Sequence, residues 1–373
     1  MNICKSPTSS LEEATSCVCD APELSRLRLA FASAKGFTPL HEASRRGRAD
    51  LVAFLLEQKA DPNACSFAQG QNIQADEDSQ ATSLHVAAAN GHSQVVELLL
   101  RARADVGAVT AQGASALLLS FGTDDGPHVD VARLIVQEML SEEQLGGSRI
   151  GKLINRADAF ECTPLHTAAK KGSVTVVELL LSVKAVQVNQ VNMSGQTPLH
   201  VASIFGHSDV VRTIAKFKEC DVNLRVQAKL RESSLHLAAR RGFFDVVLEL
   251  GVAGAHFVIE AKDSVGKIKP FQAISNESPE RPSPIDVAQD GEVREFLQTT
   301  LDLFRLCQGE PASSSNKTIH GILAAPHTRR AFLNFRTSAN NTPLHIAALS
   351  KNTRGTAWFG EQGLYLFFLF FNF

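Results

Sequence analysis

The sequence Thr-Pro-Leu-His stands at residues 38–41, 163–166, 197–200 and 342–345. Weaker copies that keep a hydroxyl-bearing first residue begin at positions 82, 115, 233 and 283. The shortest spacings between successive copies are 33 and 34 residues, and the longer spacings equal that period plus inserted residues. A recurring unit, which can stack on its neighbours and tolerate insertions at one edge, therefore decides the fold.

The first copy shows why these residue types recur. Thr38 can cap a helix with its hydroxyl, Pro39 suits the first helical position, and Gly47 can end the helix in the left-handed region. A second helix is predicted from the apolar residues at positions 51, 52, 55 and 56, which form one stripe at helical spacing. Only a neighbouring copy can cover that stripe, so the pattern predicts stacked helix pairs.

The copies resemble the ankyrin repeat family, whose pattern is Gly-x-Thr-Pro-Leu-His-x-Ala-Ala-x-x-Gly-His-x-x-Val-Val-x-Leu-Leu-Leu. The clearest matches are residues 82–100, 163–181 and 195–211, and the resemblance covers about 34–300 with a fragment at 339–350. It implies an all-α solenoid: a right-handed stack of antiparallel helix pairs with β-hairpin loops on one edge. We expect about seven repeats and a partial eighth.

The sequence predicts five segments of different character. A polar leader with a short possible capping helix precedes the array, and a linker, the partial repeat and an apolar tail follow it. The boundaries are 1–33 for the leader, 34–301 for the array with inserts near 69–80, 141–155 and 257–282, 302–338 for the linker, 339–352 for the eighth repeat and 353–373 for the tail.

The apolar tail allows three interpretations. Its ten residues at 364–373 are fewer than the roughly 17 that a membrane-spanning helix needs. Interfacial attachment lacks a flanking basic cluster. We favour a truncated chain that ends in translated non-coding sequence, because T-rich nucleotides encode Phe and Leu and the repeat pattern stops at Asn352.

Composition indicates an ordinary globular protein. Hydrophobic residues make up 44% of the chain and charged residues 20%, with a formal net charge of −2. No overall field recruits nucleic acid or membrane. The seven cysteines lack the spacing of a disulfide framework, and the N-terminus lacks the apolar core of a secretion signal. We expect an intracellular protein, cytoplasmic or nuclear, without a transmembrane span.

The search for catalytic or metal-binding motifs is negative. Six copies carry a histidine without a second ligand four residues on, which disfavours a metal site. The family resemblance implies instead that this histidine hydrogen-bonds the first helix to neighbouring loops. The six histidines are His41, His85, His166, His200, His236 and His345. A phosphate-loop-like string at 146–153 has Leu153 where magnesium binding needs Ser or Thr. We therefore expect no enzyme, no cofactor and no metal.

The family resemblance implies that partners contact the hairpin residues and the two variable positions before each helix-ending glycine. Three of these pairs are basic and one is apolar, so we expect an acidic partner segment with apolar anchors. The alternative is that Lys and Arg merely solvate helix C-termini and favour the helix dipole. The candidate partner-binding residues are Arg45, Arg46, Lys170, Lys171, Ile204, Phe205, Arg240 and Arg241, with Phe160 and Met193 on the hairpins.

The predicted function is a non-enzymatic scaffold or adaptor for protein–protein interaction. One alternative is the regulatory ankyrin region of a longer, truncated enzyme or channel. Nucleic-acid binding through the basic pairs is disfavoured by the slightly acidic overall charge.

Overall fold

The computed structural model describes residues 37–66, 80–121, 128–144, 149–225, 232–259, 272–273, 283–308, 324–337 and 339–349. The chain divides into two compact units, Met1–Arg149 and Ile150–Phe373. The predicted leader at 1–33 and tail at 353–373 lie outside the described residues, as do most of the inserts near 69–80 and 257–282.

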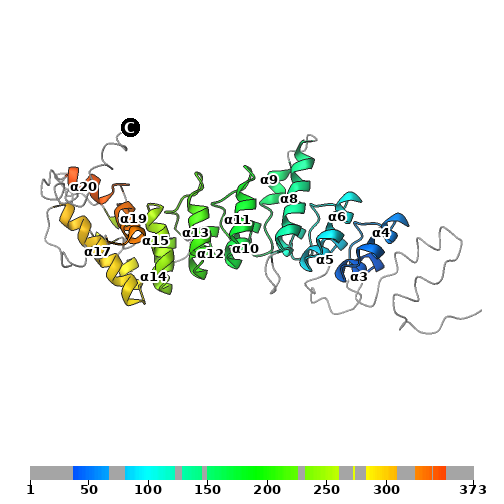
Figure 1. Cartoon of the computed structure of the whole chain (residues 1–373), viewed down its shortest axis with the longest axis horizontal. Helices are drawn as coiled ribbons and strands as arrows, with labels where there is room; N and C mark the ends of the chain where they lie inside the picture. The colour runs from blue at the N-terminus through cyan, green and yellow to red at the C-terminus, as the bar shows by residue number, and fades with distance from the viewer. Residues whose placement is uncertain are drawn as a thin grey trace, which may run out of the picture. The chain divides into compact units, whose positions relative to one another are not determined.

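The first unit is built from short helices that follow one another in pairs (Figure 1). First helices pack on first helices and second helices on second helices, so α3 contacts α5, α5 contacts α7, α4 contacts α6 and α6 contacts α8. The helices are α3 (Pro39–Arg45), α4 (Ala49–Glu57), α5 (Ser83–Ala89), α6 (Ser93–Arg101), α7 (Ala116–Leu119) and α8 (Val129–Gln144).

The second unit repeats this pairing and adds a small sheet. The first helices α10, α12, α14 and α16 pack on one another in order, as do α11, α13 and α15. Figure 1 shows the successive pairs from α10 to α15. The helices are α9 (Ile150–Ile154), α10 (Pro164–Lys171), α11 (Val174–Leu181), α12 (Pro198–Phe205), α13 (Ser208–Ala215), α14 (Ser234–Arg241), α15 (Phe244–Val252), α16 (Pro284–Val287), α17 (Gly291–Gln308), α19 (Pro326–Asn334) and α20 (Pro343–Leu349).

Each full copy of the motif starts its helix with the same cap. The backbone N–H of Thr38 donates to Nδ1 of His41 over 3.2 Å, and the backbone N–H of His41 donates to the Thr38 hydroxyl over 3.4 Å. This is a capping box with histidine in the position usually held by Glu or Gln. The same box begins α5, α10, α12 and α14.

The capping histidine also joins neighbouring repeats. Because Nδ1 of His41 accepts a hydrogen bond, the proton lies on Nε2, which donates to the Ala81 carbonyl oxygen over 2.9 Å. His85 reaches the Ala108 carbonyl over 3.1 Å in the same way. His166 bonds the Gln196 carbonyl over 2.9 Å, so the hydrogen bond to a neighbouring loop is confirmed for these three histidines.

The core lies between the two helix layers. The second helices contribute paired valines such as Val176 and Val177, which are fully buried, and small residues such as Ala168 and Ala169 let the first helices approach closely. Burying each valine stabilises the fold by about 1.5 to 3 kcal/mol relative to exposure. The apolar stripe predicted on each second helix is the face that is buried in this core.

Asparagine side chains link the loops that follow the second helices. Asn155 accepts a hydrogen bond from the backbone N–H of Gln187 over 2.7 Å, and Asn189 accepts one from Asp221 over 3.0 Å. The amide of Asn189 also donates to the Glu219 carbonyl over 2.7 Å. Adjacent loops are thus held in register by side-chain bonds as well as by helix packing.

The hairpin loops are closed mostly by single bridges. Isolated antiparallel bridges join Cys65 to Thr82, Val109 to Ser115, and Arg225 to Ser233. Among the described residues, β-strands form a single three-stranded sheet with the order β2-β1-β3. Strand β1 (His256–Ile259) pairs antiparallel with β2 (Gln272–Ala273) and parallel with β3 (Arg336–Thr337).

Two segment boundaries differ from those predicted. The chain divides at Arg149, inside the insert placed at 141–155, where α8 continues through Gln144 and α9 begins at Ile150. The segment 302–338, predicted to be a linker, contains the end of α17, all of α19 and β3. Helix α20 then forms from the partial eighth copy and packs against α17 and α19.

The C-terminal packing explains the second difference. Helix α19 lies against α15 (Figure 1), and the rings of Phe332 and Phe335 are fully buried there. Gly251 of α15 makes room, because a Cβ at that position would lie 2.7 Å from the Phe335 ring. The segment lacks the repeat motif, so repeat periodicity gave no sign that it would pack.

Candidate partner-binding surface

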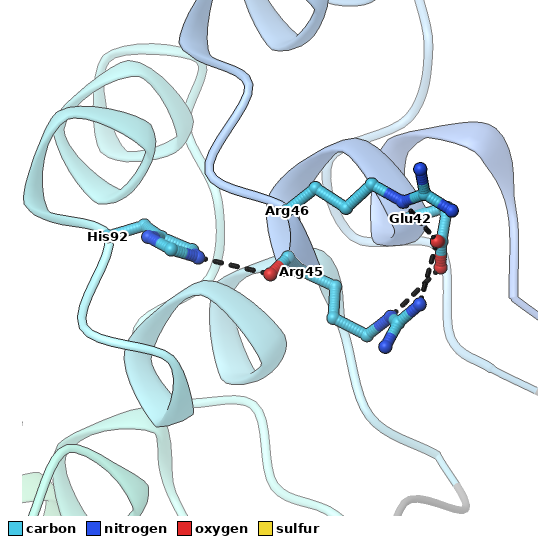
Figure 2. A network of polar contacts seen from close by, with 4 residues as sticks. All are labelled: Glu42, Arg45, Arg46 and His92. Carbon is cyan, nitrogen blue, oxygen red and sulfur yellow. Dashed lines mark hydrogen bonds and ion pairs between the residues drawn. The ribbon is translucent and has the colours of Figure 1, made fainter. Parts of the chain in front are cut away.

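A recurring contact between a histidine and a helix-ending glycine fixes the backbone just before that glycine. Gly47 has φ +68°, and a Cβ added at this position would lie only 2.7 Å from the His92 ring. His92 precedes α6, and its Nε2 is 3.0 Å from the Arg45 carbonyl oxygen (Figure 2). The backbone that carries the first basic pair is therefore held by the next helix pair.

The first basic pair is partly neutralised within its own helix. Arg45 donates to both carboxylate oxygens of Glu42, over 2.9 and 2.7 Å, and Arg46 donates to one of them over 2.7 Å (Figure 2). Hydrogen bonding from Arg45 lowers the pKa of Glu42, so the carboxylate stays charged. Two positive charges thus share one negative charge, and this pair belongs to the first unit.

The second unit holds the other six helix-end residues predicted to bind a partner. Helix α12 contacts both α10 and α14, so the ends of the three helices follow one another in a row. We call this set the helix-end row. It consists of Lys170, Lys171, Ile204, Phe205, Arg240 and Arg241.

Phe205 is the exposed apolar centre of the helix-end row. Its side chain is 46% exposed, and Nζ of Lys170 lies 5.9 Å from its ring centroid. A second contact comes from His207, whose ring stacks with Phe205 at 6.4 Å between centroids and an interplanar angle of 9°. Cation–π attraction and stacking therefore hold an exposed ring in a defined place.

The two arginines at the end of α14 have different surroundings. Arg240 forms an ion pair with Glu232, a residue that is 8% exposed. Burial raises the pKa of Glu232, and the charge of Arg240 acts in the opposite direction. Arg241 is exposed, so Arg241 offers its charge to solvent whereas Arg240 stabilises a buried carboxylate.

Two further apolar residues stand on the hairpin loops. Phe160 and Met193 are 67% and 68% exposed, and the backbone N–H of Met193 donates to the Phe160 carbonyl over 3.1 Å. Asp158 shapes the first loop by accepting hydrogen bonds from the backbone of Phe160 and Cys162, over 2.8 and 2.9 Å. The structure therefore brings Phe160 and Met193 side by side on ordered turns.

The hairpin loops that carry Phe160 and Met193 lie at the starts of the first helices, and the helix-end row lies at the other ends. Met193 precedes α12, and Phe205 is its last residue. Eight helical residues extend about 12 Å at 1.5 Å per residue. A partner that touches both areas must therefore cross the layer of first helices.

The sequence analysis missed three residues of this surface. Glu42 was visible in principle, because a carboxylate three and four residues before two arginines predicts helical ion pairs. His207 follows a helix-ending glycine, and this position alone suggests its contact with the preceding repeat. The pairing of Glu232 with Arg240 joins the residue before the N-cap of α14 to a residue near the end of that helix, and it has no local signal.

The described residues contain no helix long and apolar enough to cross a membrane. Within the same residues, His, Cys, Asp and Glu side chains form no group of three or more that could hold a metal ion.

Family models match three stretches of the chain. The model for ankyrin repeats in three copies matches residues 135–226, a single ankyrin repeat matches 35–67, and ankyrin repeats in many copies match 68–119. A solved structure that resembles the chain is the human ASB11 ankyrin repeat domain, with a TM-score of 0.49 and 23% identity, covering 70% of this chain and 97% of that one.

Curated relatives are much longer than the stretches they share with this chain. Alpha-latroinsectotoxin-Lt1a of Latrodectus tredecimguttatus is 29% identical over 52% of this chain and 12% of the toxin. A transient receptor potential cation channel subfamily A member 1 homolog of Caenorhabditis elegans is 46% identical over 16% of this chain and 5% of the channel. E3 ubiquitin-protein ligase XBAT33 of Arabidopsis thaliana is 41% identical over 21% and 15%, respectively.

Proposed function

Because this chain is a member of the ankyrin repeat family, a protein–protein interaction module, we propose that it is a non-enzymatic scaffold or adaptor. Its partner is held on the layer of first helices and hairpin loops. The observation that carries this proposal is the helix-end row of the second unit, where Phe205 is exposed yet contacts both Lys170 and His207. A fixed and exposed aromatic ring suits the role of a binding anchor.

The partner that fits this surface is an acidic segment with apolar anchors. Lys170 and Arg241 are exposed on either side of Phe205, and Phe160 with Met193 offers a second apolar contact area. The structure also refines the proposal, because Arg45, Arg46 and Arg240 already contact carboxylates of the chain itself. Lys170 and Arg241 are therefore the charges on which binding should depend most.

The test is capture of partners from source cells with the whole chain as bait. A variant with Lys170→Glu and Arg241→Glu should lose a partner that the wild-type chain retains. The matched control, Lys184→Glu with Lys216→Glu, makes the same change of charge at exposed residues away from the helix-end row. A partner retained by the charge-reversed variant, or no partner at all, would contradict the proposal.

A second candidate function rests on the relatives. The C. elegans channel homologue and the Arabidopsis ligase share only 5% and 15% of their own length with this chain. The array would then be the regulatory region of a longer protein. An antibody against residues 163–215 decides between the two, because a native protein much larger than 40.3 kDa favours the longer protein.

A further inference from the structure

The helix-end row alternates in chemistry along three successive helices of one unit. Lys170 is the second-to-last residue of α10, whereas Phe205 ends α12 and Arg241 ends α14, and all three are exposed. Direct packing of α10 on α12 and of α12 on α14 makes these helices consecutive neighbours. The order along the row is therefore basic, apolar, basic.

The spacing of this row sets the spacing of a complementary ligand. Neighbouring packed helices lie about 8 to 10 Å apart. The axes of α10 and α14 are therefore each about 10 Å from the axis of α12, although the Lys170 side chain reaches back to place its Nζ 5.9 Å from the Phe205 ring centroid. An extended chain advances about 3.3 Å per residue, so three residues cover one step. A helical ligand would need about seven residues for the same step, at 1.5 Å each.

We propose that the second unit recognises an extended peptide segment with an apolar side chain flanked by carboxylates three residues before and three residues after it. The apolar side chain packs on the ring of Phe205, and the two carboxylates meet Lys170 and Arg241. This proposal rests on the proposed function and specifies the partner of the same surface. Because the motif is symmetrical, either chain direction along the row satisfies it.

The surroundings of the row favour carboxylates over other polar groups. Lys171 adjoins Lys170 and Arg240 adjoins Arg241, so positive charge is concentrated at both ends. Glu232 offsets Arg240 at one end and leaves Arg241 as the exposed charge. Arg241 can bind a carboxylate through two parallel hydrogen bonds, whereas Lys170 acts as a point charge.

The probe is a fluorescein-labelled nonapeptide with a central leucine, aspartates three residues on either side of it, and serine and glycine elsewhere. The control peptide has the same composition with both aspartates adjacent at one end. Fluorescence polarisation with the whole chain should show the spaced peptide binding about fivefold more tightly, since each exposed charge pair contributes modestly. Equal affinity for the two peptides, or no binding of the spaced peptide, overturns the proposal.

Charge reversal adds a test that misfolding cannot imitate. Lys170→Glu should weaken binding of the spaced peptide, and replacing one aspartate of the peptide by lysine should restore it. Lys184→Glu should leave binding of the original peptide unchanged. If the lysine-containing peptide does not restore binding, the proposed register is wrong. The proposed function is tested separately: it still stands if the Lys170→Glu, Arg241→Glu variant fails to capture a partner that the wild-type chain retains.

Discussion

The Nε2 atom of His207 lies 3.0 Å from the carbonyl oxygen of Lys170, which belongs to the preceding helix pair. The same ring fills the space beside Gly172, where a Cβ would come within 2.6 Å of Nδ1. His92 repeats the arrangement at Gly47. One histidine thus connects the packing of adjacent repeats with the position of a residue that we propose to bind a partner.

Replacing Gly172 by alanine should destabilise the second unit. Gly172 has φ +74°, which costs an L-residue roughly 1 to 2 kcal/mol, and the added methyl group must also displace the His207 ring. We expect a loss of about 2 kcal/mol or more in the free energy of unfolding, measured by urea denaturation. Gly291→Ala is the matched control, because nothing lies within 4 Å of its Cβ position. Equal unfolding midpoints for the two variants would show that neither the positive φ of Gly172 nor the His207 ring excludes a side chain there.

Acid should unfold the repeats through the capping histidines. Burial lowers the pKa of His85 and of His200 from the ordinary 6.5 to about 4. The unfolded chain therefore binds protons that the folded chain excludes. Keeping each histidine neutral in the folded chain contributes to the free energy of unfolding. The contribution is complete above pH 6.5 and is lost as the pH falls towards 4, by roughly 3 kcal/mol for each histidine. Urea unfolding between about pH 7.5 and about pH 5 measures the slope.

A glutamine substitution tests the origin of that slope. Glutamine at position 85 can still accept from the Thr82 backbone, as in an ordinary capping box, but it does not titrate. We expect His85→Gln to be less stable near neutral pH, since it loses the bond to the Ala108 carbonyl. Its stability should also fall less steeply with acid. An unchanged slope would assign the acid sensitivity to other groups.

The adjacent arginines at the end of α14 should respond differently to charge reversal. Arg240→Glu removes the partner of buried Glu232 and adds a second carboxylate beside it. Because Arg240 is partly exposed, leaving Glu232 without its partner should cost about 1 to 3 kcal/mol. Arg241→Glu should change stability by less than about 0.5 kcal/mol, because the side chain is exposed. Thermal unfolding of both variants checks this, and similar losses would show that Glu232 does not depend on Arg240.

Local patterns predicted the repeated parts of the structure well. The Thr-Pro-Leu-His motif predicted helix starts such as Pro39 and Pro198, because capping and proline geometry act within one turn. The valine pairs of the second helices predicted the buried face for the same reason. The histidine bonds between repeats followed from the family resemblance.

The remaining features depend on contacts between distant residues. Phe335 packs against Gly251, far away in the sequence, and no periodic pattern connects them. The ion pair between Glu232 and Arg240 likewise forms only after the hairpin and helix are in place. Sequence analysis could therefore locate the basic pairs but could not show that Arg240 is already neutralised and Arg241 is exposed.

The contact between Gly251 and Phe335 gives the most direct test of the C-terminal packing. In the interior of a helix, alanine usually stabilises by about 1 kcal/mol relative to glycine. At Gly251 the sign should reverse, because the new methyl group would lie 2.7 Å from a fully buried ring and 3.1 Å from Ala331. Overpacking of this kind costs about 1 to 3 kcal/mol, so urea unfolding should show Gly251→Ala to be destabilised.

A double-mutant cycle separates this contact from any general weakness of α15. Phe335→Ala alone should cost about 3 to 5 kcal/mol through the cavity it leaves. In the double variant the methyl group at position 251 occupies part of that cavity, so the combined loss should be smaller than the sum by about 1 kcal/mol or more. Gly151→Ala serves as the control, since its Cβ position meets Ala185 at an ordinary 3.7 Å. Strict additivity of the two losses would mean that α19 does not pack on α15 through Phe335.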